Sequence, residues 1–173
     1  MNVNRGKILS RGLLTLYLMV LIWLVLFKWT FHISSILNHP HRSLNLIPFA
    51  APSMVHGAIN YGEMIMNCVF FIPFGLLLSV NFKKIRFASK LSFILGFSLT
   101  AELTQYIFAI GATDITDVIT NTLGGLIGLL LYEVSNKYIR SEKLDRIIIF
   151  LGSLLFFTFI CIHLSHFFLR RSG

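Results

Sequence analysis

Long apolar runs alternate with short polar connections along most of this chain. Each run has roughly 20 residues, the length that a helix needs to cross the hydrocarbon core of a bilayer. We predict five spans, at about residues 12–31, 64–80, 88–110, 115–134 and 147–169. The pattern therefore predicts an all-α, polytopic bundle of membrane helices that forms one domain over residues 1–173.

The connection between the first two predicted spans, residues 32–63, is long for a compact bundle. It contains Asn45-Leu46-Ile47-Pro48-Phe49. This segment is too apolar for a solvated loop and too short to cross a membrane. We therefore expect it to lie in the outer membrane interface or to re-enter the membrane from that side.

Proline and glycine predict two local features of the helices. Pro73 stands in the middle of the second span, where the missing N–H group predicts a kink. Gly124, Gly125 and Gly128 lie together on the fourth span. This small-residue spacing is typical of closely packed membrane helices.

The low charge content of the chain supports an integral membrane protein. Of 173 residues, 55% are hydrophobic and 13% are charged, whereas about a quarter are charged in soluble domains. Of the 15 Lys and Arg residues, 11 lie at the N-terminus or near the connections after the second and fourth spans. Because basic residues favour the cytoplasmic side, we predict a cytoplasmic N-terminus. The basic residues form no continuous stripe, which argues against nucleic acid as a partner.

Polar side chains gather in the outer halves of three predicted helices. Glu102 and Gln105 are three residues apart on the third span, so they share one face. Asp117 and Asn121 are four apart on the fourth span, which a short turn makes the antiparallel neighbour of the third. The second span and its start carry a similar stripe, Asn60, Glu63 and Asn67. These stripes predict a polar pocket near the outer membrane face.

Helix capping and helix packing offer alternative explanations for part of this cluster. Asp114 fits the N-cap of the fourth span, and Asp117 fits the acidic third position of a capping box. Asn121 lies one turn deeper, where an amide can bond between helices. Glu102 lies about two turns inside its span with no cap to make, so it is the strongest candidate for a site residue.

Few cations are available to the predicted pocket. Arg42 directly precedes the 45–49 segment, and we expect it to fold over the pocket. Lys28 is expected to extend to the lipid headgroups instead. The sequence has no HExxH pattern, and His163 and His166, three apart near the outer end of the fifth span, are interpreted as interfacial residues. We therefore expect neither a metal nor a cofactor.

Five motifs follow one another in a fixed order along the chain. They are Asn45-Leu46-Ile47-Pro48-Phe49, Asn67 with Phe71-Ile72-Pro73-Phe74-Gly75, Glu102-Leu103-Thr104-Gln105, Asp114-Ile115-Thr116-Asp117 and Asn121-Thr122-Leu123-Gly124. In order and spacing this set resembles the VanZ family, over nearly the whole chain. The resemblance implies a multi-pass protein of the bacterial cytoplasmic membrane that confers resistance to teicoplanin and related lipoglycopeptides. It implies no settled reaction.

One position departs from the family pattern. Many members carry an arginine directly before the aspartate pair, whereas this chain has Gly111-Ala112-Thr113 there. Arg42 is the candidate to replace that cation.

The leading hypothesis is a binding protein without catalytic activity. Its outer pocket would hold an amphiphile, either the lipid part of a lipoglycopeptide or a lipid-linked cell-wall precursor. The expected ligand-binding residues are Glu102, Gln105, Asp117, Asn121, Asn67 and Arg42. The alternative is a membrane-embedded enzyme that modifies a lipid-linked or cell-surface substrate, with Glu102 and Asp117 as acid and base. A transporter is disfavoured because the chain lacks an inverted repeat and matching polar residues in its cytoplasmic half.

Overall fold

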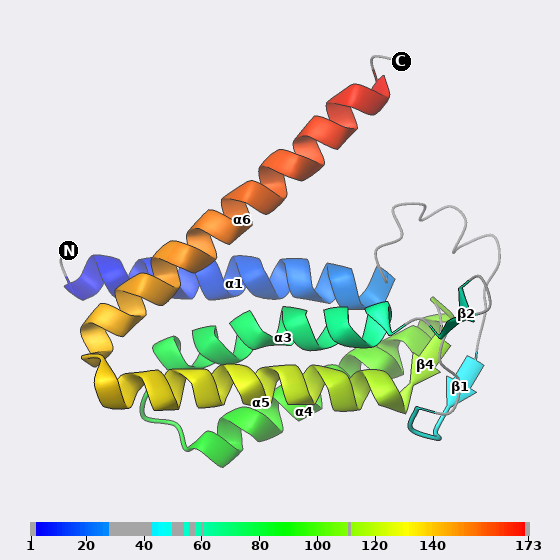
Figure 1. The fold of residues 1–173 in the computed structure, drawn as a ribbon, viewed down its shortest axis with the longest axis horizontal. Helices are drawn as coiled ribbons and strands as arrows, with labels where there is room; N and C mark the ends of the chain where they lie inside the picture. Colours follow the sequence, from blue (N-terminus) through cyan, green and yellow to red (C-terminus); the bar gives the residue numbers. More distant parts are fainter. Residues whose placement is uncertain are drawn as a thin grey trace.

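The computed structural model describes residues 3–27, 43–49, 54–55, 58–59, 61–110 and 112–171. The helices in this part of the chain are α1 (Val3–Phe27), α3 (Gly62–Asn81), α4 (Phe87–Phe108), α5 (Ile115–Tyr138) and α6 (Ser141–Arg171). Helices α1, α3, α4 and α5 lie side by side along the long axis of the molecule, and α6 leaves this bundle at an angle (Figure 1). The predicted all-α helical bundle is confirmed.

Four helices among the described residues are long and apolar enough to cross a membrane. They are Gly6–Phe27 within α1 and the full lengths of α3, α4 and α5. They correspond to the first four predicted spans. The fifth predicted span, 147–169, lies within α6, and its crossing of the membrane stays a prediction. Many apolar side chains on the bundle, including Met19, Leu103 and Leu130, are exposed, which suits a surface in contact with lipid tails.

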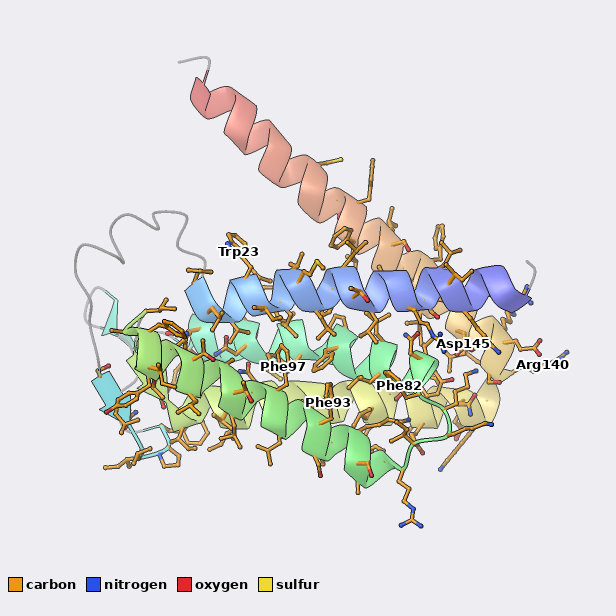
Figure 2. All side chains as sticks on the ribbon, turned by 180° about the vertical axis from the view of Figure 1, so that it is seen from behind. Trp23, Phe82, Phe93, Phe97, Arg140 and Asp145 are labelled. Atoms are coloured by element: carbon orange, nitrogen blue, oxygen red, sulfur yellow. The ribbon has the colours of Figure 1, made fainter. Side chains whose placement is uncertain are left out.

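The apolar core forms around α3. Phe71 and Phe74 of α3 are fully buried, as are Leu21 of α1 and Leu129 of α5. The ring of Phe97 reaches this core from α4, and its centroid lies 5.3 Å from that of Phe74 (Figure 2). Such aromatic pairs add about 0.5–1.5 kcal/mol beyond the burial of their area. Helix α3 is thus the central helix of the bundle.

Helices α3 and α5 approach so closely at Gly124 and Gly128 that no Cβ atom fits at these two positions. A Cβ atom on Gly124 would lie 2.0 Å from the backbone oxygen of Cys68, and one on Gly128 would lie 2.1 Å from that of Ile72. The predicted close packing at these two glycines is confirmed. Helix α3 remains one helix through Pro73.

Two short strand pairs lie at one end of the bundle, which we call the strand end. Strand β1 (Ser43–Asn45) pairs in parallel with β4 (Ala112–Asp114), and β2 (Met54–Val55) pairs antiparallel with β3 (Ala58–Ile59). The first pair places the 45–49 segment against the start of α5. Leu46, Ile47 and Phe49 of this segment are more than half exposed, as an interfacial segment requires, and its position in a membrane stays a prediction.

The basic connections meet at the opposite end, which we call the basic end. The start of α1, the 82–86 connection and the α5–α6 turn at 139–140 lie there (Figure 1). Arg140, Asp145 and Phe82 mark this end in Figure 2. Basic residues favour the cytoplasmic side, so the strand end is expected to face outward.

Candidate functional site

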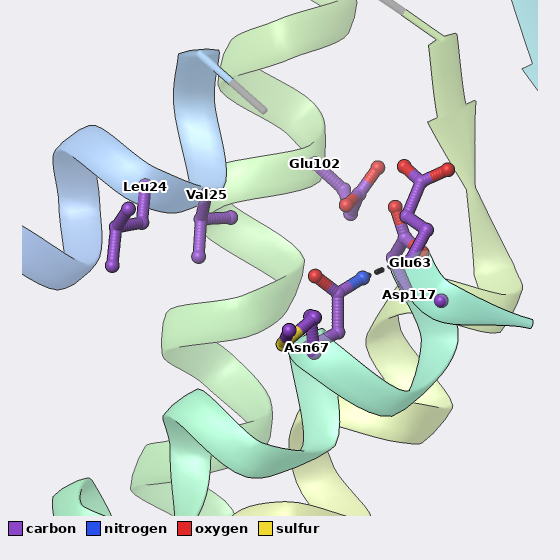
Figure 3. A pocket seen from close by; sticks show the side chains of 8 residues that line it. Leu24, Val25, Glu63, Asn67, Glu102 and Asp117 are labelled. Atoms are coloured by element: carbon purple, nitrogen blue, oxygen red, sulfur yellow. Dashed lines mark hydrogen bonds between the residues drawn. The ribbon is translucent and has the colours of Figure 1, made fainter. Parts of the chain in front are cut away.

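A pocket of about 330 Å³ lies near the strand end, between α1, α3, α4 and α5. Its polar lining comes from Glu63, Asn67, Glu102 and Asp117 (Figure 3). Its remaining lining residues are Leu24, Val25, Gly62 and Met66. The polar groups thus come from α3, α4 and α5, and Leu24 and Val25 of α1 form an apolar wall across from them (Figure 3).

Asp117 and Asn67 join α5 to α3 within the pocket. Asn67 Nδ2 donates a hydrogen bond to Asp117 Oδ1 at 2.8 Å (Figure 3). Asp117 is 5% exposed, so little water competes for this hydrogen bond. Charge-assisted bonds of this kind are about twice as strong as neutral ones. Asn67 therefore holds the Asp117 side chain in place within the pocket.

Glu102 binds the turn that leads into α5. Its Oε2 atom accepts a hydrogen bond from the backbone N–H of Asp114 at 3.0 Å, and its backbone oxygen accepts one from Thr113 Oγ1 at 3.2 Å. Glu102 is 3% exposed. The carboxylate thus fixes the α4–α5 turn while it also lines the pocket.

Asp114 is the N-cap of α5, as the sequence predicts. Its Oδ1 atom accepts a hydrogen bond from the backbone N–H of Thr116 at 2.7 Å. Its Oδ2 atom accepts one from Asn45 Nδ2 at 3.0 Å, which connects the 45–49 segment to the helix. Capping therefore accounts for Asp114 without a role in the pocket.

Asp114→Ala should lower the free energy of unfolding by about 1–2 kcal/mol, because α5 loses its cap and Asn45 loses its acceptor. Asp114→Asn is the matched control, since its side-chain oxygen still caps the helix. Thermal unfolding of the purified protein in detergent measures both variants. Equal midpoints for Asp114→Ala and the wild type would show that the cap contributes nothing.

Gln105 and Asn121 lie beside the pocket and bind between helices. Gln105 Nε2 donates to the backbone oxygen of Val25 in α1 at 2.9 Å. Asn121 Nδ2 donates to Ser98 Oγ in α4 at 2.9 Å. Both residues are fully buried. They position α1 and α5 against α4, and neither is among the residues that line the pocket. Arg42 and Lys28 lie outside the described residues.

A comparison with protein families matches residues 14–136 to the model described as VanZ/LLP1. The chain belongs to the VanZ/LLP1 family. It is also 62% identical over 150 residues to a protein of Enterococcus faecium that is called Protein VanZ. The aligned residues cover 87% of this chain and 89% of that protein. No solved structure matches the chain.

The matched region contains every residue that lines the pocket. It runs from within α1 to near the end of α5 and excludes α6. The pocket is therefore built from the part of the chain that defines VanZ/LLP1 membership.

Glu63 lines the pocket, although it was not among the expected ligand-binding residues and was predicted only as part of a polar stripe. It lies in the first turn of α3, one helical turn before Asn67, and the two residues share a face. The spacing of four residues was the available signal. With Glu63 the described lining has three carboxylates and no basic side chain. Such a lining favours ligand groups that donate hydrogen bonds or carry positive charge.

Proposed function

We propose that this VanZ/LLP1-family protein confers resistance to teicoplanin-type lipoglycopeptides by binding an amphiphile in the strand-end pocket. The bound molecule is either the lipid part of the antibiotic or a lipid-linked cell-wall precursor. Binding at the outer membrane face lowers productive binding of the antibiotic at the cell surface.

The mixed lining of the pocket is the observation that carries this proposal. Glu63, Asn67 and Asp117 provide polar partners, and Leu24 and Val25 of α1 provide apolar contact across from them (Figure 3). An amphiphile presents hydroxyl, amide or amine donors next to an alkyl chain. Small-molecule sites commonly combine an apolar wall with a few placed polar groups.

The size of the pocket limits what it holds. A volume of about 330 Å³ is at the lower end of the range of roughly 300–1,000 Å³ for small-molecule sites. It suits one headgroup segment with the adjoining alkyl chain, while the rest of a large ligand stays outside. Arg42 would then engage an anionic group of the same ligand.

Asp117→Ala and Glu102→Ala should each reduce teicoplanin resistance to the level of host cells without the protein. The loss of a charged hydrogen-bonding group costs about 1.5–3 kcal/mol, which is roughly a 10- to 150-fold loss of affinity. The measurement is the minimal inhibitory concentration in a susceptible bacterium that expresses each variant. Immunoblots of the membrane fraction check that abundance is unchanged.

Two further variants separate loss of binding from loss of folding. Met66→Trp fills the pocket from a position that is 45% exposed and leaves all three carboxylates in place, so resistance should fall while abundance is maintained. Glu133→Gln removes an exposed carboxylate of α5 that lies outside the pocket, and it should retain full resistance. Full resistance in both alanine variants and in Met66→Trp would overturn the proposal.

The enzymatic alternative has one supporting observation. Glu102 and Asp117 line the same pocket but have different partners, the Asp114 N–H group and the Asn67 amide. Carboxylates in different surroundings can divide into acid and base. Mass spectrometry of lipids and peptidoglycan from expressing cells decides between the two functions. A new product that disappears in Asp117→Ala indicates an enzyme, and unchanged composition supports binding.

A further inference from the structure

A second cavity, of about 590 Å³, lies at the basic end of the bundle and shares no lining residue with the proposed binding pocket. The start of α1, the end of α3, the 82–86 connection and the start of α6 form its walls. The basic side chains in the lining are Lys7, Arg11, Lys83, Lys84 and Arg146. The acidic ones are Glu142 and Asp145. The lining thus has a clear excess of positive charge.

The contacts of Asp145 leave the excess of positive charge in the lining unchanged, because its ion pair with Lys83 removes one charge of each sign. Asp145 forms an ion pair with Lys83 Nζ and accepts a hydrogen bond from the hydroxyl of Tyr132 at 2.9 Å. Its negative charge is therefore engaged with Lys83 on one side of the cavity. Lys7, Arg11, Lys84 and Arg146 face the cavity against Glu142 alone.

A third cavity, of about 410 Å³, lies next to the basic one between α1, α3 and α6. On α3 the basic cavity ends at Val80, and the third cavity extends from Leu77 to Val69. On α6 Ile149 lines the basic cavity and the neighbouring Ile148 lines the third. The third cavity therefore begins about one helical turn from the basic cavity and extends towards the strand end.

The third cavity is apolar and elongated. The hydroxyl of Tyr17 donates to the backbone oxygen of Phe70 at 2.5 Å, so this polar atom is already bonded. On α1 the lining runs from Leu13 to Leu24, which is about 16 Å at the rise of an α-helix. An acyl chain that spans half of the hydrocarbon core has a similar length, about 15 Å. Leu24 also lines the strand-end pocket, so the far end of this cavity lies next to that pocket.

We propose that the two cavities together bind one anionic phospholipid from the leaflet at the basic end. Arg11, Lys84 and Arg146 hold its phosphate, and an acyl chain lies along the apolar cavity between α1, α3 and α6. Basic pockets between membrane helices on the cytoplasmic side bind anionic headgroups in this way. A free anion fills only the basic cavity, and a neutral lipid fills only the apolar cavity. The combination of the two cavities therefore selects an anionic phospholipid.

The position of α6 gives this lipid a structural consequence. Helix α6 contacts the bundle near its start and then diverges from α1 (Figure 1). Leu151 and Leu155 of α6 line the apolar cavity opposite α1 and α3. An acyl chain there fills the space between α6 and the bundle, so lipid binding should stabilise the folded protein.

Thermal unfolding of the full chain in a neutral detergent tests the proposal. Dioleoylphosphatidylglycerol should raise the unfolding midpoint in a saturable manner. Dioleoylphosphatidylcholine, which lacks net charge, and glycerol 3-phosphate, which lacks acyl chains, should each raise it much less, because each fills only one of the two cavities. An equal shift with the zwitterionic lipid, or with glycerol 3-phosphate, would overturn the proposal.

Charge variants locate the headgroup. The double variant Arg11→Gln/Arg146→Gln should bind the anionic lipid roughly 30-fold more weakly, because each basic residue near a membrane surface contributes about a fivefold factor. Lys137→Gln/Arg140→Gln is the matched control, since both residues lie at the basic end without lining the cavity. Equal weakening in both double variants would show general surface attraction and refute the site.

Two single variants cover the case in which the double variant does not fold. Lys84→Gln, in the exposed 82–86 connection, should weaken binding of the anionic lipid about fivefold. Val69→Trp narrows the apolar cavity from a position that is 46% exposed, and it should also weaken binding. Native mass spectrometry counts the bound lipid, and unchanged occupancy in both variants would refute the assignment.

Discussion

Gly128→Ala should destabilise the bundle by about 3 kcal/mol, the upper part of the usual range for overpacking. The added Cβ atom would lie 2.1 Å from the backbone oxygen of Ile72 and 3.1 Å from the Cα atom of Gly75. These are backbone atoms of α3, so no side chain can turn aside to make room. Helices α3 and α5 must separate, and the pocket that they form together changes with them.

Gly96→Ala is the matched control for this prediction. Gly96 also lies within a membrane helix, α4, but a Cβ atom there would meet nothing within 4 Å. Its replacement should be neutral or stabilise by about 0.5–1 kcal/mol, because alanine loses less backbone entropy in a helix. Unfolding midpoints in detergent compare the two variants. Similar midpoints would contradict the close approach of α3 and α5.

Asn67→Asp should destabilise the protein because it places a carboxylate opposite that of Asp117. The present N–H···O distance between these side chains is 2.8 Å. Two like charges about 4 Å apart repel by roughly 4 kcal/mol at an effective dielectric constant of 20, and proton uptake reduces this cost. We expect a loss of about 2–4 kcal/mol in the unfolding free energy. Asp117→Asn should cost only about 1 kcal/mol, since two amides still form a hydrogen bond.

The double variant Asn67→Asp/Asp117→Asn restores the hydrogen bond with donor and acceptor exchanged between α3 and α5. Its unfolding free energy should return to within about 1 kcal/mol of the wild type. Recovery of stability without recovery of resistance would show that the ligand requires the negative charge on α5. If the double variant is no more stable than Asn67→Asp, the pairing seen in the pocket is wrong.

The helices were predictable because a run of apolar residues favours a membrane helix whatever the rest of the chain does. The fourth predicted span begins at residue 115, where α5 begins, and the N-cap role of Asp114 follows from the residues around it. The start of α3 is two residues before the predicted position, at Gly62. Helix ends depend on one or two hydrogen bonds, so such a difference is expected.

Three pocket residues were also predictable, and their partners were not. Spacings of three and four placed Asn67, Glu102 and Asp117 on polar faces at similar depth, and the structure brings all three to one pocket. Gln105 and Asn121 lie on the same polar faces and were also expected in the pocket, but they bond to Val25 and Ser98 instead. Helical spacing gives the face of a residue but not its neighbour, because the neighbour depends on the rotation and offset of a second helix.

By itself, the sequence determined the membrane helices, the cluster of basic residues at one end and the polar stripes at the other, since each depends on the order of residues in one segment. Only the tertiary structure decided that Asn67 bonds Asp117, that Glu63 joins the pocket and that Glu102 fixes the α4–α5 turn. The physical reason lies in the contact of Gly124 and Gly128 with α3. That contact sets the distance and register between α3 and α5, and with them the pairing of Asn67 with Asp117.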